Sequence, residues 1–493
     1  MKRKTAALLP LLLAGACTTV GPDFRRPAAP SAEAGYADDG GDRVALAEGP
    51  DREWWKAFAS PELDALVDQA IAGNHSLTAS KETLEKARQR IAAVSGKALP
   101  QVDANASAEY QKFNLSAFGL SDRLGGTGIS NPEFDLYTLG AGVSYDLDLF
   151  GRNRRAVEQA VAEAEAQQRA TEAAHLLIAG RVVTQVLAIA ALNDTIATQR
   201  QLLSEDERNV SLTEARRKAG AGTLVEVLSA QGQLAGDRGS LPALEQQLAE
   251  GRAMLAVLLG ISPAELGPTN FSLDQFVLPT NIPVALPSAL VRKRPDILEA
   301  EARLHAAVAG VGIATADLYP DITLGASITQ STSEPERITS SKFNAFDIFA
   351  GLTAPIFHGG TLKANKRGAE SEARSAAAQY EQIVTEAFGQ VSSLLSALDN
   401  DKRELAARHE AAEIAGRSLY LSRRSFQVGN SGILQVLDAS RSYQRAKLSL
   451  LDTRANQYQN VARLYVATAG GWLSEVTAET RTDRPDPVQV SRK

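Results

Sequence analysis

The chain has 493 residues, of which 22% are charged and only 5% are aromatic, and its formal net charge is −6 at pH 7. Ala, Leu, Gln, Glu and Arg recur throughout, a composition typical of long helices and coiled coils. This charge argues against a nucleic acid partner, because binding to duplex phosphates requires a basic protein face.

The first residues have the pattern of a targeting signal. A basic start at Lys2, Arg3 and Lys4 precedes an apolar run that ends at Ala16 and is too short to span a bilayer as a helix. The next residue, Cys17, is the only cysteine, which excludes internal disulfides and cysteine-ligated metal sites. Removal of this segment before Cys17 would leave a net charge of about −9.

Residues 1–16 resemble a bacterial lipoprotein signal, in which the cysteine is lipidated and becomes the mature N-terminus. Ala14 departs from the leucine that is more usual at its position. Thr18, rather than aspartate, follows the cysteine and resembles the pattern that is sorted to the outer membrane. We predict a lipid anchor on Cys17, and the alternative is an ordinary signal peptide with an incidental cysteine.

Residues 17–60 are predicted to form a lipid-anchored tether. Pro, Gly and Ala are frequent up to about Pro50, which favours an extended segment over a packed element. Helical periodicity begins near Pro61.

From Pro61 onwards the sequence repeats itself. The stretches 74–100 and 294–320 are each 27 residues long, are helical in pattern and end in a proline that leads into a strand. Internal similarity of this kind predicts two copies of one structural unit. The predicted boundaries are as follows: repeat 1 at residues 61–272, repeat 2 at residues 288–471, and a disordered C-terminal tail at residues 472–493.

Both copies contain the same heptad of apolar residues. One series of five begins at Val182 and the other begins 209 residues later at Val391. Spacing by seven makes a seam for the supercoiling of helix on helix. The proline-free stretches around these seams, residues 152–219 and 360–428, predict two helices that are each about 100 Å long at 1.5 Å per residue.

Each long helix is expected to end at a glycine-bearing turn, beginning at Gly220 or Gly429, after which a second helix returns antiparallel. In the first copy we expect the return in two pieces, at about 224–260 and 295–317, on either side of a Pro-rich insert. Three residues should break or kink the first of these pieces: Gly236, Gly239 and Pro242.

Four segments alternate between apolar and other residues with a period of two, as in strands with one apolar face. They are Val102–Tyr110, Tyr137–Leu149, Ile322–Ile328 and, more weakly, Phe346–Ile356. About ten residues is the length of a tilted strand that spans a bilayer, although two soluble hairpins would show the same pattern. Because four strands cannot close a barrel in lipid, a membrane barrel would have to be shared between chains, and three copies would supply twelve strands.

Several short motifs along the chain are shared with a known family. They are Val20-Gly-Pro-Asp-Phe24 with Pro27, Asp148-Leu-Phe-Gly-Arg152, Arg294-Pro-Asp-Ile297 through Glu301, Gly312 and Pro320, and Pro355-Ile-Phe357 with Gly359-Gly360. With these motifs the chain resembles the outer-membrane efflux channels of the TolC type, within the lipoprotein branch that includes OprM and the NodT-like proteins. The resemblance extends from Cys17 to Trp472.

The resemblance implies a mixed, mainly α fold in a homotrimer. Long coiled-coil helices would form a periplasmic helical barrel, and the four strands of each chain would join a twelve-stranded β-barrel in the outer membrane. The function implied is the exit duct of a tripartite efflux pump. Drugs or other small toxic compounds would reach it from an inner-membrane resistance-nodulation-division (RND) pump and a periplasmic adaptor, or membrane fusion, protein. No cofactor is implied.

Enzyme motifs do not compete with this interpretation. Gly310-Val-Gly312 lies within a helical pattern with no preceding strand, which argues against a dinucleotide-binding loop. His409-Glu410 is followed by Glu413 rather than a second histidine, so the spacing of a zinc protease is absent. We therefore predict no catalytic and no metal site.

Two other functions remain open on the sequence. A TolC-like channel for type I protein secretion would have the same fold, and the anchor at Cys17 favours efflux over it. A periplasmic adaptor lipoprotein would have a single helical hairpin flanked by soluble β domains, whereas two hairpins are predicted here.

A candidate gate follows the second glycine turn. Leu434, Asp438 and Arg441 are spaced i, i+4 and i+7, which places them on one face of the returning helix, and the aligned residues of copy one are uncharged. They could be an ordinary solvated face with a helical Asp–Arg pair. The resemblance implies instead that Leu434 and Asp438 line a periplasmic constriction and that Arg441 ties the inner helices to their neighbours.

Overall fold

The computed structural model describes six ranges of the chain: residues 19–28, 36, 44–47, 49–112, 133–279 and 281–469. The predicted signal peptide, Cys17 and the C-terminal tail at 472–493 lie outside these ranges. The chain divides into two compact units. Unit 1 contains the chain up to Arg26, Glu85–Glu165 and Ala302–Ala378, and unit 2 contains Pro27–Leu84, Ala166–Glu301 and the chain from Gln379.

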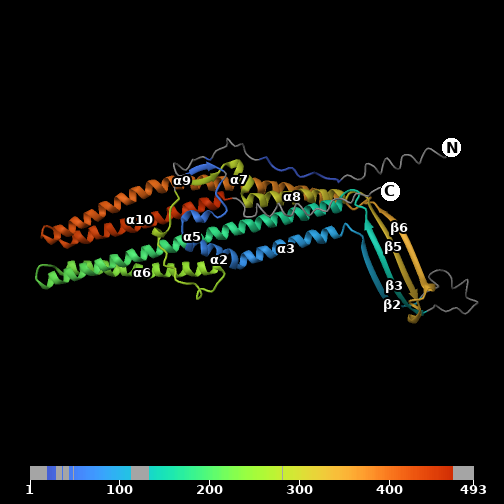
Figure 1. The fold of residues 1–493 in the computed structure, drawn as a ribbon, viewed down its shortest axis with the longest axis horizontal. Coiled ribbons are helices and arrows are strands. Elements are labelled where there is room, and N and C mark those ends of the chain that lie inside the picture. Colours follow the sequence, from blue (N-terminus) through green and yellow to red (C-terminus); the bar gives the residue numbers. More distant parts are fainter. Residues whose placement is uncertain are drawn as a thin grey trace, which may run out of the picture. The chain divides into compact units, whose positions relative to one another are not determined.

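The same order of elements occurs twice along the chain (Figure 1). The first set is α3 (His75–Gly96), β2 (Gln101–Lys112), β3 (Glu133–Asp146), α5 (Arg152–Lys218) and α6 (Leu224–Leu259). The second set is α8 (Pro295–Ala316), β5 (Asp321–Thr332), β6 (Asn344–Thr353), α9 (Thr361–Gln427) and α10 (Ile433–Thr468). Corresponding helices have equal lengths of 22, 67 and 36 residues. This match supports the predicted internal duplication.

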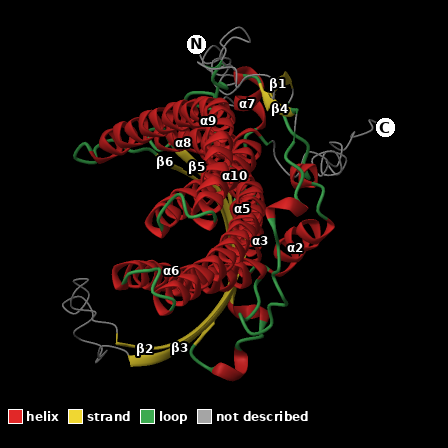
Figure 2. Cartoon of the chain, turned by 90° about the vertical axis from the view of Figure 1, so that its left-hand side faces the viewer, coloured by secondary structure: helices red, strands yellow, loops and turns green. Residues whose placement is uncertain are grey.

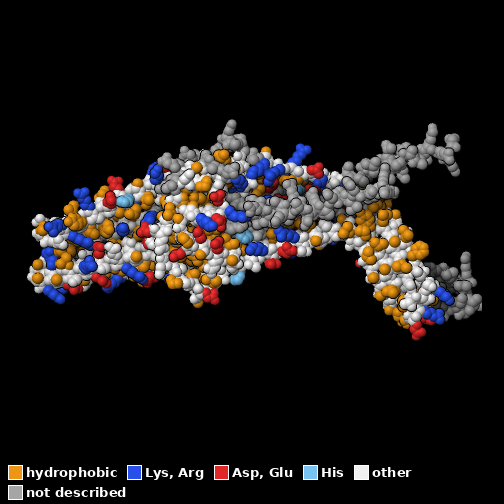
Figure 3. Space-filling model, viewed as in Figure 1, with side chains coloured by type: hydrophobic (Ala, Val, Ile, Leu, Met, Phe, Trp, Pro, Cys, Tyr) orange, Lys and Arg blue, Asp and Glu red, His pale blue; other side chains and the backbone are white. Residues whose placement is uncertain are grey.

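The four strands of unit 1 form one antiparallel sheet in the order β2-β3-β5-β6. The sequence predicted two strand pairs, and the pairing of β3 with β5 joins them. The register aligns apolar residues across all four strands, as in the row Val102, Val143, Ala326 and Ile348. The adjacent row points to the other face and is polar or small: Asp103, Gly142, Ser327 and Asp347. Figure 3 shows hydrophobic side chains gathered over these strands.

Two strands end earlier than the alternation predicted. β3 ends at Asp146 rather than Leu149, because Asp148 has a positive φ of 46° and caps α5. Its carboxylate accepts hydrogen bonds from the backbone amides of Asn153 and Arg154 at 2.9 and 3.1 Å. β6 ends at Thr353, ahead of Pro355, which has no amide to donate.

The predicted heptad seams are buried. Eight of the ten seam residues are buried, and Val210 and Leu405 are half-buried. Among the described helices, α5 alone contains a stretch long and apolar enough to span a bilayer, and 61% of that stretch is buried, as in a core helix. The two long helices therefore pack through the faces that the sequence indicated.

The helix α6 returns along α5 without a break. Gln185 Nε2 donates to the carbonyl of Gly251 at 3.0 Å, and Arg238 and Glu207 form an ion pair at 2.7 Å, so the two helices run antiparallel. The predicted break at Pro242 is wrong, because α6 continues through it. Asp237 C=O accepts hydrogen bonds from Ser240 Oγ at 2.7 Å and Gln199 Nε2 at 3.2 Å. These side-chain bonds and the packing on α5 outweigh the local helix propensity.

The predicted tether is partly a packed structure. Within unit 2, β1 (Val44–Ala47) pairs in parallel with β4 (Ile282–Ala285), as Figure 2 shows. The 3₁₀ helix η2 (Trp54–Phe58) buries both of its tryptophans and its phenylalanine in the main core of the unit. The prediction of an extended tether over residues 17–60 is therefore wrong for these two stretches. Their partners are distant in sequence and leave no periodic signal.

The other described elements are short. The helix α2 (Pro61–Gly73) is capped by Ser60, whose hydroxyl accepts a hydrogen bond from the amide of Leu63 at 3.3 Å. The remaining ones are η4 (Leu273–Gln275), α7 (Pro287–Lys293), η5 (Pro335–Arg337) and η6 (Ser341–Phe343).

Candidate functional site

The turn before α10 sets the direction of the predicted gate residues. Gly429 has a φ of 84°, which favours glycine, and the amide of Asn430 donates to the carbonyl of Ser425 at 2.9 Å. This closes α9 and starts α10 at Ile433. The apolar residues Ile433, Val436 and Leu437 of the new helix are then buried in a small core with α9.

Leu434, Asp438 and Arg441 lie on the opposite, exposed face of α10. The side chain of Leu434 is 50% exposed. Among the residues that the structure describes, neither Asp438 nor Arg441 has an ion-pair partner. The three residues therefore share a face, as their spacing predicted. Within a single chain this face is free to meet a further surface.

Arg441 also lines a groove between α6 and α10 with a volume of about 580 Å³. Its walls are Ser229, Gly232, Gln233, Gly236 and Asp237 of α6 and Arg441, Gln444 and Arg445 of α10. Ser229 and Gly232 are the residues of copy one that align with Asp438 and Arg441. Small uncharged residues thus face the guanidinium, where a second copy of the charged pair would bring cation against cation.

A polar cluster beside this groove was not predicted from the sequence. Asp206 of α5 is 1% exposed, and its two carboxylate oxygens accept hydrogen bonds from Gln233 of α6 at 3.2 Å and Gln444 of α10 at 3.0 Å. The sequence contains one signal of this cluster. Asp206 lies three residues after Leu203 and therefore occupies the second seam position of the heptad, where an apolar residue is expected.

A second polar contact joins the same two hairpins. Arg423 of α9 forms an ion pair with Glu205 of α5 at 2.6 Å, and both side chains are only partly exposed. The hairpin α5–α6 is therefore attached to the hairpin α9–α10 by two neighbouring polar links. One is an ion pair and the other is a hydrogen bond to a buried carboxyl.

The N-terminal segment that carries the motif Val20–Phe24 is held in unit 1 by Arg155 of α5. Arg155 donates to the carbonyl of Val20 at 3.3 Å, to Asp23 at 2.7 Å and to Glu158 at 2.7 Å, and its own side chain is only 4% exposed. Phe24 stacks on His305 of α8 with ring centroids 4.4 Å apart. The motif therefore docks the start of the mature chain on two helices.

Gly312, which the sequence singled out, has a steric role at this contact. A Cβ on Gly312 would lie 2.8 Å from Cγ of Arg155, and a Cβ on Gly21 would lie 2.6 Å from Cα of Gly312. Both distances are too short for carbon atoms that are not bonded. Glycine at both positions lets the N-terminal segment, α8 and Arg155 approach one another.

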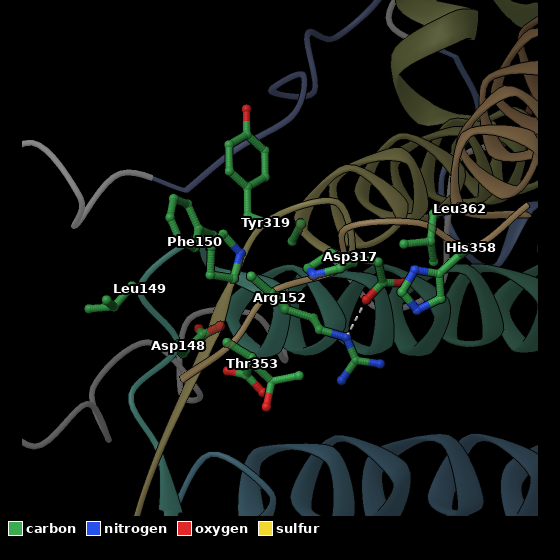
Figure 4. A pocket seen from close by; sticks show the side chains of 14 residues that line it. Asp148, Leu149, Phe150, Arg152, Asp317, Tyr319, Thr353, His358 and Leu362 are labelled. Atoms are coloured by element: carbon green, nitrogen blue, oxygen red, sulfur yellow. Dashed lines mark hydrogen bonds and ion pairs between the residues drawn. The ribbon is translucent and has the colours of Figure 1, made fainter. Parts of the chain in front are cut away.

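A pocket of about 320 Å³ lies where the strands of unit 1 join its helices (Figure 4). Arg152 points toward Asp317 and pairs with it at 2.6 Å. Phe150 stacks on Tyr319 with centroids 4.6 Å apart. Across the described ranges, no three His, Cys, Asp or Glu side chains converge as metal ligands. The motif Asp148–Arg152 thus builds a strand-to-helix turn.

The comparisons with known proteins agree with this architecture. The profile of the outer membrane efflux protein family matches residues 66–261 and 286–470. The chain is 31% identical to the pyoverdine export outer membrane protein OpmQ of Pseudomonas putida over 426 residues, which cover 86% of this chain and 89% of OpmQ. It is 26% identical to the probable outer membrane lipoprotein SilC of Salmonella typhimurium over 475 residues, covering 96% of this chain and 99% of SilC.

A solved structure matches as closely in fold. The outer-membrane channel OprN superposes with a TM-score of 0.84 at 28% identity, covering 92% of this chain and 100% of OprN. With the family profile matched over most of its length in two consecutive blocks, the chain belongs to the outer membrane efflux protein family.

Proposed function

We propose that the chain is the outer-membrane exit duct of a tripartite efflux pump, active as a homotrimer. It would take drugs or other small toxic compounds from an inner-membrane RND pump and a periplasmic adaptor and release them outside. One observation carries the proposal: a four-stranded sheet with an apolar face and two free edges is built into the same chain as two long helical hairpins.

The edges of the sheet support assembly with further copies. β2 and β6 each pair on one side only, and they are 12 and 10 residues long, as a tilted membrane strand requires. In lipid, each unsatisfied backbone group on such an edge costs several kcal/mol. Pairing of β6 with β2 of the next copy removes both edges, and three copies close a barrel of twelve strands.

The sheet also has the surface that a membrane strand needs. Val102 is 74% exposed, Phe346 is 77% exposed and Ile348 is 80% exposed, all on the apolar face. A soluble hairpin would bury such residues against a core. The alternation therefore favours a lipid-facing side and a polar lumen over the two soluble hairpins that the sequence left open.

Assembly can be tested directly. We expect the protein to run as a homotrimer in mild detergent, because a lone chain leaves both edge strands unpaired. Light scattering with detergent correction gives the mass of the particle. A folded, stable monomer by the same measurement would contradict the proposal.

The N-terminal segment supports lipid anchoring at Cys17. The amide of Val20 donates to the carbonyl of Phe150 at 3.1 Å, and Thr19 lies against Gly151, so the chain two residues after the cysteine is held at the end of the sheet. An acyl chain there would reach the same membrane that the sheet would enter. Each buried methylene would add about 0.8 kcal/mol of membrane affinity.

Replacement of Cys17 tests the anchor. Cys17→Ser should abolish incorporation of labelled palmitate, because the serine hydroxyl cannot accept the lipid in this pathway, while trimers can still assemble through the strands. Labelled wild-type protein is the control. Retention of the label by the variant would refute the anchor and leave the barrel proposal untouched.

The gate is proposed at the exposed face of α10. Leu434 and Asp438 would line the periplasmic constriction with one set from each subunit, and Arg441, which lines the groove toward α6, would tie the helices together. Engagement of the adaptor and pump would open this ring.

The two rival functions are less well supported. A periplasmic adaptor would have one helical hairpin, whereas this chain has two, α5–α6 and α9–α10. A channel for type I protein secretion shares the fold, and the matched family is named for efflux. A pulldown that identifies the inner-membrane partner distinguishes an efflux pump from a protein-secretion transporter.

A further inference from the structure

Three helices converge on the buried carboxyl of Asp206. It lies on α5, accepts hydrogen bonds from Gln233 of α6 and Gln444 of α10, and hydrogen-bonds with the carboxyl of Asp237 of α6. Two carboxyl groups can hydrogen-bond to each other only when one of them carries a proton. The cluster therefore has the geometry of a proton site.

The count of donors and acceptors leads to the same conclusion. Oε1 of Gln233, a side chain that is only 7% exposed, and Oδ2 of Asp237 are both buried without a hydrogen-bond donor. Buried acceptors without donors are uncommon and costly. A proton on the carboxyl of Asp206 supplies the donor that this arrangement lacks.

The neighbouring charges do not neutralise Asp206. On α5, Glu205 is paired with Arg423 of α9 at 2.6 Å and Glu207 is paired with Arg238 of α6 at 2.7 Å. Arg441 and Arg445 of α10 line the groove, and among the described residues no arginine or lysine bonds to Asp206.

Burial has the largest effect on this group. Burial, followed by the hydrogen bond with Asp237, raises the pKa of Asp206 to about 7, and the hydrogen bond from Gln444 acts in the opposite direction. The negative charges of Asp237 and Glu205 raise the pKa further. The proton is thus held in the range where the periplasm operates.

We infer that Asp206 holds a proton that it donates to Asp237, and that release of this proton weakens the attachment of α10 to the α5–α6 hairpin. Once both carboxyls are charged, they repel each other in a buried site, and Asp206 can move away from Gln444. Because the proton is bound more tightly in the attached state, the attachment is complete below neutral pH and is lost as the pH rises through about 7.

This inference deepens the proposed function, because α10 carries the proposed gate three residues or more before Gln444. If the chain is an efflux duct, alkaline conditions would favour an open gate and acidic conditions a closed one. The proton site itself does not depend on that function, and the two can fail separately.

The first experiment detects the proton. Infrared difference spectra of the detergent-solubilised protein between about pH 6 and about pH 8 should contain a protonated carboxyl band that disappears on the alkaline side. Asp206→Asn should remove the band, and Glu207→Gln, one residue further along α5, should leave it. A spectrum in which the band survives in Asp206→Asn would assign the proton elsewhere and overturn the inference.

The second experiment follows the attachment of α10. Hydrogen exchange at residues 436–444, corrected for the intrinsic pH dependence, should speed up in the wild type by up to about tenfold per pH unit above about pH 7, since one proton is released. Asp206→Asn keeps the hydrogen bond without a charge and should be slow at all pH values. Asp206→Ala removes the link and should be fast at all pH values.

The outcomes separate the possibilities. A pH response that Glu207→Gln retains and both Asp206 variants lose supports the inference. A response that persists in Asp206→Asn, or no response in the wild type, overturns it. Absence of channel conductance in bilayers would instead contradict the proposed function, and it would leave the infrared and exchange results interpretable.

Discussion

Replacement of Asp438 and Arg441 together by alanine should raise single-channel conductance in planar bilayers and make cells that carry the channel leaky to bulky antibiotics. Three Asp438 carboxylates held about 10 Å apart around an axis repel by about 1.7 kcal/mol per pair at an effective dielectric constant of about 20. The closed ring then depends on compensation, for which Arg441 is the nearest candidate on the same helix. A charge-assisted contact is worth about 1.5–3 kcal/mol. Its loss would shift the ratio of closed to open channels about tenfold or more.

A matched control is available on the neighbouring helix. Asp399 and Arg403 of α9 form an exposed i, i+4 pair at 3.0 Å, and their replacement by alanine removes the same two residue types away from the gate. This control should conduct like the wild type. Unchanged conductance in the Asp438 and Arg441 double variant, with the trimer intact, would place the gate elsewhere and leave these residues as a solvated face.

Gly312→Ala should release the N-terminal segment from unit 1. The added methyl would lie 2.8–2.9 Å from three side-chain atoms of Arg155, so the guanidinium would have to leave Val20 and Asp23. Overpacking of this kind costs about 1–3 kcal/mol. The amide of Val20, which bonds to Phe150, should therefore exchange about 5- to 150-fold faster.

Gly310 provides the control on the same helix. A Cβ there would contact only Gln159, at 3.6 Å, which is an ordinary separation, so Gly310→Ala should leave the exchange of Val20 unchanged. If both variants exchange alike, the tight approach at Gly312 does not hold the segment. The helix propensity gained from alanine is the same in both, so it cancels from the comparison.

Local periodicity explains which elements could be predicted from the sequence. The long helices begin and end within a residue or two of the predicted proline-free stretches, because a heptad seam runs through each and glycine turns close them. The four strands follow from alternation alone. Pro242 was misjudged because packing on α5 decides the course of α6, and such packing is not written in the residues around the proline.

Features that depend on distant residues could not be predicted. β1 is four residues long and pairs with a segment 238 residues later, so neither strand has a pattern of its own. The two tryptophans of η2 are almost completely buried, yet no nearby periodicity indicates their core. Asp206 did leave a signal at a seam position, but its partner Gln444 lies 238 residues away. The shared face of Leu434, Asp438 and Arg441 followed from spacing, and their role stays a prediction.

The pairing of β3 with β5 has a consequence for the ancestry of the chain. It joins the two halves of one polypeptide in the way that β6 and β2 would join successive polypeptides, so each half contributes two strands and one hairpin of equal size. Six half-length chains would then contain the same strands and helices as three full-length ones. Fusion of two such genes would halve the number of subunits that must meet, and would leave each half free to diverge, as the charged face of α10 has diverged from α6.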